Sequence, residues 1–159
     1  MESIHARHYI HRDIKPDHFM TGVDDHIYLI DFGLAQNFRD PTTHVHIPLT
    51  TGNNLVGTIR YTSINSHMGL QQSRRDDLES LAYTVMHLLC RKLPWQGISL
   101  SHNTIRQSIV HHRKRELCQY NHDIIPSSLM TFVHYSRSLS FKEKPDYVYL
   151  HGLIKKLLA

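Results

Sequence analysis

Residues 10–33 constrain the fold more strongly than any other stretch of this 159-residue chain. They contain two short apolar runs, 19–21 and 27–30, separated by the polar sequence Gly-Val-Asp-Asp. Short apolar runs on either side of a polar turn predict a β-hairpin. A hairpin brings its two ends together. We therefore expect Asp13, which precedes the hairpin, and Asp31, which follows it, to lie at one site.

Charged motifs flank this hairpin on both sides. The sequence reads His-Arg-Asp-Ile-Lys-Pro at 11–16 and Asp-Phe-Gly at 31–33. These motifs resemble the catalytic-loop and metal-binding signatures of protein kinases. The resemblance covers nearly the whole chain. Four further segments are similar to the casein kinase 1 branch of that family: His-Ile-Pro at 46–48, Gly-Thr-Ile-Arg-Tyr at 57–61, Ser-Ile-Asn at 63–65 and Ser-Arg-Arg-Asp-Asp-Leu-Glu-Ser at 73–80.

The resemblance implies a Ser/Thr protein kinase that uses ATP and Mg²⁺. Phosphoryl transfer requires one carboxylate near the acceptor hydroxyl and a second one that holds magnesium. By resemblance Asp13 is the first and Asp31 is the second. Lys15 would stabilise the charge of the transferred phosphoryl group, and a lysine at this position is similar to Ser/Thr kinases rather than tyrosine kinases.

His18 departs from the kinase pattern. The family's catalytic loop reads H-R-D-x-x-x-x-N, and the asparagine supplies an oxygen ligand to the second magnesium ion. This chain has His18 at that position. Mg²⁺ takes oxygen ligands in octahedral geometry, whereas imidazole suits zinc, copper or iron. His18 is therefore a poor replacement as a metal ligand.

The resemblance also implies residues that support the loop or bind substrate. Asp77 would reach the backbone of the loop that contains His11 and Arg12 and hold it in place. Members of the casein kinase 1 branch favour acidic or already phosphorylated protein substrates, and arginine side chains suit phosphate oxygens. Three positions match residues that bind such anions in this branch: Arg60, Gly97 and Arg106.

Length limits the domain organisation. A chain of 159 residues suffices for one domain with a core but is too short for a two-lobed kinase, and no G-x-G-x-x-G motif occurs among its 7 glycines. We expect a mainly α fold (α+β by family): a kinase-like C-terminal lobe over 1–159 with a small β-hairpin, the N-terminal lobe being absent. Its parts would be the catalytic loop 11–18, Asp-Phe-Gly at 31–33, the activation and substrate loop 34–66 and a helical bundle 77–158. A linker between two small domains is the alternative for 34–66.

Apolar spacing predicts the helices of this bundle. The segment 77–91 is apolar nearly all the way round, which predicts an interior helix, and Asp76 or Asp77 is expected to cap its start. Residues 127–138 are expected to form an amphipathic helix after a proline start signal. A final helix is expected from Pro145 onward. The apolar side chains that these two helices are expected to bury are Leu129, Phe132, Val133, Leu150, Leu153, Ile154 and Leu157.

The helix expected at 104–118 carries a basic run. Its apolar residues Ile105, Ile109 and Leu117 are expected to point inward, and the run His-His-Arg-Lys-Arg at 111–115 to point outward. Such a run is typical of a solvated helix face, with a nuclear signal or a nucleic-acid patch as the alternatives. The net charge of +4 fits acidic partners or an ordinary basic surface. No recognition motif or aromatic platform accompanies it, so we do not expect a nucleic-acid partner.

Histidines and cysteines are the residues that could indicate a metal site. The chain has 15 histidines, but the close pairs at 44–46 and 111–112 lack a second pair at zinc-finger spacing. Cys90 and Cys118 are expected to be reduced thiols. The first residues lack the apolar core of a signal peptide, and no run reaches membrane-spanning length. We expect a cytoplasmic and/or nuclear protein without a membrane partner.

Two functions remain open from the sequence. The first is a casein kinase 1-like fragment that transfers the ATP γ-phosphate to Ser/Thr of acidic or phospho-primed proteins, with an N-terminal lobe supplied in trans. The second is a pseudokinase or truncated binding module that displays the substrate groove without turning over ATP. Since ATP positioning supplies much of the rate enhancement, the isolated chain is expected to be inactive. In most kinases the arginine that corresponds to Arg137 pairs with a glutamate at the end of the activation segment. This chain has Asn65 at the position of that glutamate.

Overall fold

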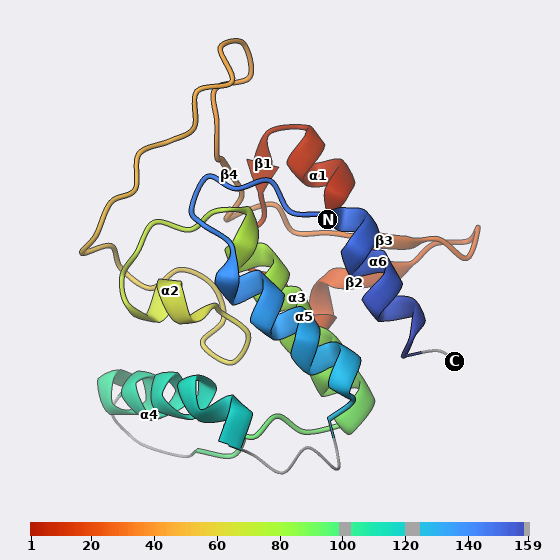
Figure 1. Cartoon of the computed structure of the whole chain (residues 1–159), viewed down its shortest axis with the longest axis vertical. Helices are drawn as coiled ribbons and strands as arrows, with labels where there is room; N and C mark the ends of the chain where they lie inside the picture. The colour runs from red at the N-terminus through yellow and green to blue at the C-terminus, as the bar shows by residue number, and fades with distance from the viewer. Residues whose placement is uncertain (99–102, 120–124, 158–159) are drawn as a thin grey trace.

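The computed structural model describes residues 1–98, 103–119 and 125–157. It is mostly helical, with two small two-stranded sheets (Figure 1). Residue 158, the expected end of the helical bundle, and the side chain of Cys118 lie outside the described part. The elements are α1 Glu2–Ala6, β1 Tyr9–Ile10, the 3₁₀ turn η1 Pro16–His18, β2 Phe19–Thr21, β3 Ile27–Leu29, β4 Gln36–Asn37, α2 Ile64–His67, α3 Arg74–Cys90, α4 Asn103–Arg115, the 3₁₀ turn η2 Glu116–Gln119, α5 Ser127–Ser138 and α6 Tyr147–Lys155.

The core lies where α3 and α5 pack against each other (Figure 1). The predicted α5 is confirmed with its boundaries at 127 and 138. Burial of each large apolar side chain contributes about 1.5–3 kcal/mol, so this helix pair accounts for much of the stability. The buried side chains that the two helices bring together are Leu78, Ala82, Tyr83, Met86, Leu129, Met130, Phe132 and Val133.

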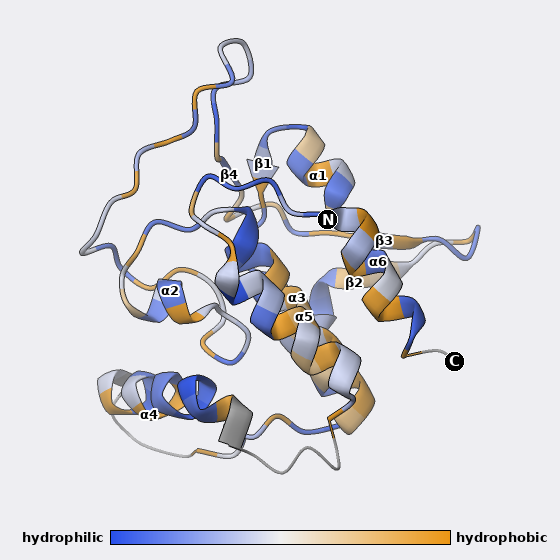
Figure 2. Ribbon diagram, in the orientation of Figure 1, coloured by the Kyte–Doolittle hydropathy of each residue, from blue (hydrophilic) through white to orange (hydrophobic). Residues whose placement is uncertain are grey.

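The ends of α3 differ from the prediction. The helix begins at Arg74, three residues earlier than expected, and Ser73 precedes it as the N-cap. Asp76 lies in the first turn, where its carboxylate accepts a hydrogen bond from the Ser73 N–H at 2.7 Å. The prediction that α3 is interior on all sides is wrong at its C-terminal end, because Leu88 and Leu89 are exposed. Figure 2 shows this apolar end at the edge of the molecule.

Both sheets lie near the predicted hairpin. The two predicted apolar runs form β2 and β3, which pair antiparallel with Phe19 opposite Leu29. The second sheet was not predicted: β1 pairs antiparallel with β4, with Ile10 opposite Gln36. Strands of two residues are too short to give a periodic signal in the sequence. This second pairing ties the chain before the hairpin to the chain after it.

The helix α6 packs against α5, and α4 packs against α2. In α4 the predicted inward and outward faces are wrong at two residues. Ile105, expected to point inward, is exposed, and Lys114, expected to point outward, is fully buried. Val110 and Leu117 are the apolar residues that reach the core from this region. The start of α6 matches the prediction, since the Asp146 carboxylate accepts a hydrogen bond from the Tyr149 N–H at 2.9 Å.

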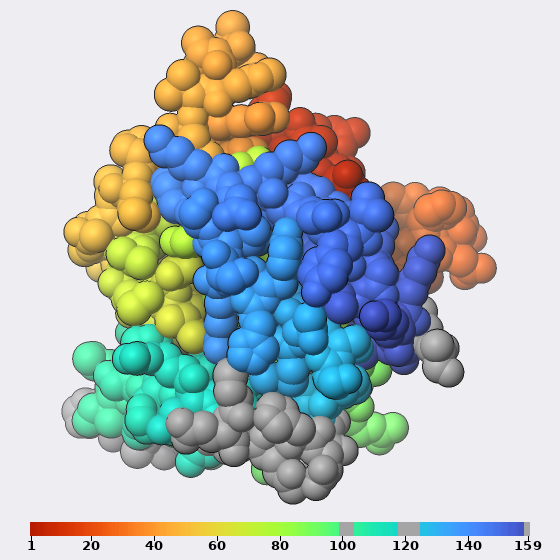
Figure 3. All heavy atoms as spheres, in the orientation of Figure 1, coloured from red at the N-terminus to blue at the C-terminus, as the bar shows by residue number. Residues whose placement is uncertain are grey.

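The segment between β4 and α2 follows the surface. Its first half projects from the body of the molecule (Figure 3), with a single bridge between Arg39 and His46. Its second half returns to α3 through the short α2, whose N-cap Ser63 accepts a hydrogen bond from the Ser66 N–H at 3.1 Å. Among the described residues, no helix has the length and apolar character needed to span a membrane.

Candidate active site

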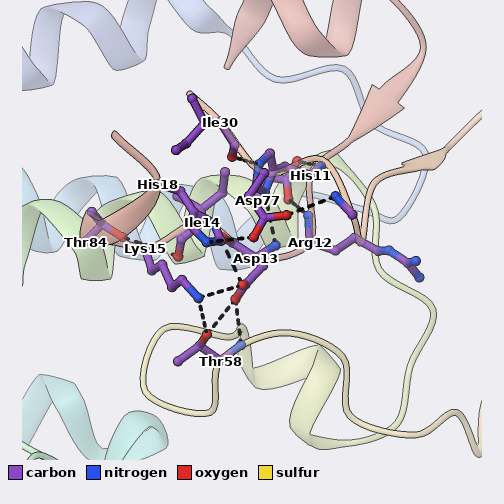
Figure 4. A network of polar contacts seen from close by, with 12 residues as sticks. His11, Arg12, Asp13, Ile14, Lys15, His18, Ile30, Thr58, Asp77 and Thr84 are labelled. Carbon is purple, nitrogen blue, oxygen red and sulfur yellow. Dashed lines mark hydrogen bonds and ion pairs between the residues drawn. The ribbon is translucent and has the colours of Figure 1, made fainter. Parts of the chain in front are cut away.

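A buried carboxylate on α3 fixes the turn at His11 and Arg12 (Figure 4). Asp77 is 1% exposed, and its oxygens accept hydrogen bonds from the backbone N–H of His11 at 2.7 Å and of Arg12 at 2.9 Å. Arg12 has a φ of 69°, in the left-handed region that costs a non-glycine residue about 1–2 kcal/mol. Hydrogen bonds to a carboxylate are strong enough to offset this cost. The backbone contact expected for Asp77 is present.

His11 connects this turn to the end of the hairpin. Its Nδ1 accepts a hydrogen bond from the Asp13 N–H at 3.3 Å, so that its Nε2–H donates to the Ile30 carbonyl at 3.0 Å. The ring is fully buried and lies edge-on to Phe32 at 5.0 Å. His11 therefore holds the backbone on either side of the hairpin in a fixed relation.

Asp13 is held between a lysine and a threonine. Its Oδ2 pairs with Lys15 Nζ at 3.1 Å, and its Oδ1 accepts hydrogen bonds from the Thr58 N–H at 2.8 Å and the Thr58 hydroxyl at 2.7 Å. Burial pushes the pKa of Asp13 upward, but the hydrogen bonds from Thr58 and Lys15 outweigh it, and the pKa lies below its usual value. Asp13 is therefore ionised at neutral pH.

Thr58 was not predicted as a partner of Asp13. Gly57 makes the contact possible, because a Cβ at this position would lie 2.4 Å from the Arg12 carbonyl oxygen. Its φ of 94° also suits glycine rather than other residues. The sequence signal for this contact is a glycine directly before a residue with a hydroxyl side chain. Such a pair indicates a close approach of two backbone segments only once the fold is known.

His18 lies between the two aspartates. Its Nδ1–H donates to the Asp13 carbonyl at 2.9 Å, and its Nε2 lies 3.2 Å from Asp31 Oδ2. Both partners are acceptors, so each ring nitrogen of His18 faces an oxygen. The Asp31 side chain is 59% exposed, and its Oδ1 accepts a hydrogen bond from the Gly33 N–H at 3.2 Å. Asp13 and Asp31 thus lie on either side of one imidazole.

The three predicted anion-binding residues lie together. Arg60, Gly97 and Arg106 all line one small cavity beside Trp95. The two arginines also line a neighbouring open cavity of about 320 Å³, together with Lys15 and Thr58. Neither arginine has a carboxylate within 4 Å in the part of the chain that the structure describes. A positively charged hollow therefore adjoins the Lys15 side of Asp13.

Oxygen ligands for a metal are few at this site. Over residues 1–98, 103–119 and 125–157, no group of three or more His, Cys, Asp or Glu side chains could hold a metal ion. Asp31 presents one exposed carboxylate. One carboxylate fits Mg²⁺ where substrate phosphates supply further ligands. His18 turns its ring nitrogens toward the two aspartates and offers no oxygen, so it does not fit a second Mg²⁺.

A comparison with protein-family models identifies the fold. Residues 1–150 match the model of the protein kinase domain. This match spans more than half of the chain. The chain belongs to the protein kinase family. Enzymes of this family generally use ATP and Mg²⁺, and the exposed Asp31 carboxylate suits one Mg²⁺.

Kinases usually pair an arginine at the position of Arg137 with a glutamate. In this chain the partner is Glu79 on α3. Arg137 Nε lies 2.9 Å from Glu79 Oε1, and its NH2 group donates to the Tyr83 hydroxyl at 2.7 Å and to the Lys114 carbonyl at 2.8 Å. The Tyr83 hydroxyl also donates to Glu79. Burial opposes the charge of Arg137, but Tyr83 and Glu79 raise its pKa. Sequence reasoning missed Glu79 because the local pattern of α3 does not show that this residue faces Arg137 on α5.

Asn65, which stands where most kinases have the glutamate, binds elsewhere. Its Nδ2 donates to Asp76 Oδ1 at 3.0 Å, and the neighbouring Ile64 N–H donates to Glu79 Oε2 at 3.3 Å. Both acidic residues belong to the first two turns of α3. The acidic partner of Arg137 therefore lies on α3 and not at the end of the 34–66 segment. The Ile64 N–H of that segment donates a hydrogen bond to the same glutamate.

Lys114 holds the turn that carries Thr58. Its Nζ donates to the carbonyls of Ile59 at 2.8 Å and Thr62 at 2.5 Å and lies 3.2 Å from His67 Nε2. The ammonium group also lies 5.0 Å from the centre of the Tyr83 ring. Burial lowers the pKa of Lys114 well below its usual value. The prediction that this lysine faces solvent was wrong because its acceptors come from a distant loop.

His67 should make stability depend on pH. Burial, followed by the nearby Lys114 and His111, lowers the pKa of His67 from 6.5 to about 3. The unfolded chain binds this proton below about pH 6.5 and the folded chain does not, so the stabilisation is complete above pH 6.5 and falls as the pH drops toward 3. Between pH 7 and pH 5 we expect the free energy of unfolding to fall about 2 kcal/mol more in the wild type than in His67→Gln.

Urea unfolding at several pH values, followed by Trp95 fluorescence, measures this difference. Glutamine keeps an acceptor for Lys114, and the other histidines are common to both proteins. Parallel pH profiles for the two proteins would contradict a neutral, partly buried His67.

Proposed function

We propose that this chain is the catalytic half of a casein kinase 1-like Ser/Thr protein kinase which, when completed by an N-terminal lobe, transfers the ATP γ-phosphate to acidic or phospho-primed proteins. The observation that carries the proposal is the ionised Asp13 held between Lys15 and Thr58, beside an open cavity lined by two arginines. A carboxylate that accepts a proton, next to a cation and an anion-binding surface, suits transfer of a phosphoryl group to a hydroxyl.

In the proposed reaction Asp13 orients the substrate hydroxyl and accepts its proton. A substrate hydroxyl would take over hydrogen bonds that Thr58 now makes to the carboxylate. Lys15 Nζ, at 3.1 Å from Asp13 and 3.5 Å from the Thr58 hydroxyl, would offset negative charge on the transferred group. Arg60 and Arg106 would bind an acidic or phosphorylated side chain of the substrate.

ATP with Mg²⁺ is the cofactor that the proposal requires. Asp31 would hold one Mg²⁺, which would neutralise the negative charge of the phosphates. His18 would leave the second ion of the usual kinase pair without a ligand from this position. We propose that the nucleotide-holding part of the kinase domain is supplied by an N-terminal lobe, in trans if it is not part of the same protein.

A binding module is the second candidate function. His18 supports it, as does a group of exposed apolar side chains on and after the hairpin: Met20, Ile27, Ile30 and Phe32. Exposed apolar groups of this kind are typical of contact surfaces. In this alternative the chain displays the substrate groove, as a pseudokinase does, and does not turn over ATP.

Addition of a kinase N-terminal lobe separates the two functions. The assay measures transfer from radiolabelled ATP with Mg²⁺ to an acidic serine peptide by the 159-residue chain, alone and with a casein kinase 1 N-terminal lobe fused before Met1. We expect no transfer by the chain alone and transfer above the background of the lobe in the fusion. A folded fusion that binds ATP but transfers nothing would favour the binding module. Transfer by the chain alone would overturn the need for the lobe.

A further inference from the structure

A second cavity lies away from Asp13, between α1, the segment after β4, the start of α3 and the start of α6. Its volume is about 250 Å³. Figure 1 shows these elements together at the end of the molecule where α1 lies. Residues from four separate parts of the chain line it: Glu2, His5, Ala6, Arg39, Arg74, Lys144 and Tyr147. None of them belongs to the proposed phosphoryl-transfer site.

Arg74 is the buried cation of this cavity. It is 7% exposed, and its guanidinium carbon lies 4.4 Å from the centre of the Phe38 ring. One terminal nitrogen donates to the Lys142 carbonyl at 2.6 Å, but the Nε–H is buried without a hydrogen-bond partner. A buried donor without an acceptor costs about 1–3 kcal/mol, more when it is charged. The position of Arg74 therefore needs an additional explanation.

Arg39 adds a second guanidinium on the same ring. Its carbon lies 5.4 Å from the Phe38 centre, and its Nε–H donates to His8 Nδ1 at 2.8 Å. Burial lowers the pKa of Arg74, and Arg39 lowers it further by repulsion. In the described part of the chain, no carboxylate lies within 4 Å of either guanidinium. Two like charges thus line the same cavity without a carboxylate in contact with either of them in the described part of the chain.

The remaining charges leave this cavity positive. Lys144 is a third cation, Glu2 is the one carboxylate in the lining, and the Tyr147 hydroxyl bonds to His5 Nδ1 at 2.7 Å. The cations exceed the carboxylates by two. We infer that this cavity is a binding site for a phosphate group, whose two negative charges and several acceptor oxygens match the excess charge and the unsatisfied donor.

The chemistry favours phosphate over a single carboxylate. Guanidinium groups present parallel N–H donors that match phosphate oxygens, and two of them with a lysine suit a dianion. The group could be inorganic phosphate or a phosphorylated side chain of a partner protein. Binding at this cavity does not depend on phosphoryl transfer at Asp13.

NMR titration of the ¹⁵N-labelled full chain tests the inference. The signal to follow is the Nε–H of Arg74, which reports this cavity and not the one lined by Arg60 and Arg106. The probes are inorganic phosphate, a phosphoserine peptide and the same peptide without phosphate, at constant ionic strength. We expect a saturable shift of the Arg74 signal with phosphate and none with an equal concentration of chloride.

Charge variants locate the site without disturbing the buried arginine. Lys144→Gln should weaken phosphate binding about fivefold and Glu2→Gln should tighten it by a similar factor, since each changes one charge at the rim. Lys155→Gln, on the exposed end of α6, is the matched control and should leave the affinity unchanged.

The outcomes are distinct. Equal affinities for inorganic phosphate and phosphopeptide assign a free phosphate site, and much tighter binding of the phosphopeptide assigns a phosphorylated partner. A static Arg74 signal with every probe, or equal effects of the Lys144 and Lys155 variants, would overturn the inference. A fusion that is inactive in the transfer assay would leave this titration unaffected.

Discussion

Asp13→Asn should lower phosphoryl transfer by the chain completed with an N-terminal lobe about 10³-fold, within the range that general-base catalysis contributes. Asparagine has the same shape and can still accept a hydrogen bond from Thr58, which binds Oδ1 at 2.8 and 2.7 Å. It cannot accept the proton of the substrate hydroxyl, and it removes the charge that pairs with Lys15 at 3.1 Å. The loss should therefore appear in kcat at saturating peptide.

The matched control for this variant is Asp25→Asn. Asp25 lies in the hairpin turn with a φ of 58°, a conformation that asparagine adopts readily, and it is exposed. We expect it to retain the wild-type rate. Near-ultraviolet circular dichroism should show the same fold for both variants. An Asp13→Asn fusion that transfers at the wild-type rate would remove Asp13 from the reaction.

Glu79→Leu should lower the free energy of unfolding by about 3–5 kcal/mol, the usual cost of removing one partner of a buried ion pair. The change leaves the Arg137 guanidinium without its 2.9 Å partner and removes the acceptor of the Tyr83 hydroxyl. It also removes the acceptor of the Ile64 N–H. Urea unfolding followed by Trp95 fluorescence measures the effect, because the ring centres of Trp95 and Tyr83 lie 4.8 Å apart in the same core.

Two further variants distinguish the buried pair from ordinary charge effects. Glu116→Leu removes the partner of His112 on the surface and should cost less than about 1 kcal/mol. The double variant Glu79→Leu with Arg137→Met should recover part of the lost stability, since the Arg137 charge is then no longer left without its partner. Equal losses in the Glu79 and Glu116 variants would show that the pair contributes nothing beyond a surface contact.

Local patterns predicted the parts of the fold that depend on neighbouring residues. The apolar runs on either side of a polar turn gave the strands β2 and β3, and spacing with a proline start gave α5. Each of these signals lies within a few consecutive residues. The motifs around Asp13 and Asp31 likewise indicated the kinase family that residues 1–150 match.

The features that the sequence did not reveal depend on contacts between distant segments. Lys114 belongs to a run of basic residues, and nothing in that run distinguishes the one that binds the carbonyls of Ile59 and Thr62. Glu79 takes over the pairing of Arg137 only because α3 and α5 pack with those two positions facing each other. Burial of a charged residue is decided by its acceptors, and periodicity carries no information about them.

The contact at Gly57 also limits where the long surface segment can move. The backbone at 57 lies against the Arg12 carbonyl with no room for a side chain, so Thr58 is clamped to the loop that it contacts. The half of the segment that projects beyond β4 has its own bridge between Arg39 and His46, and it contacts the body through Arg39, whose Nε–H donates to His8 Nδ1 at 2.8 Å. A change in the projecting half would therefore leave the Thr58 N–H bound to Asp13 at 2.8 Å.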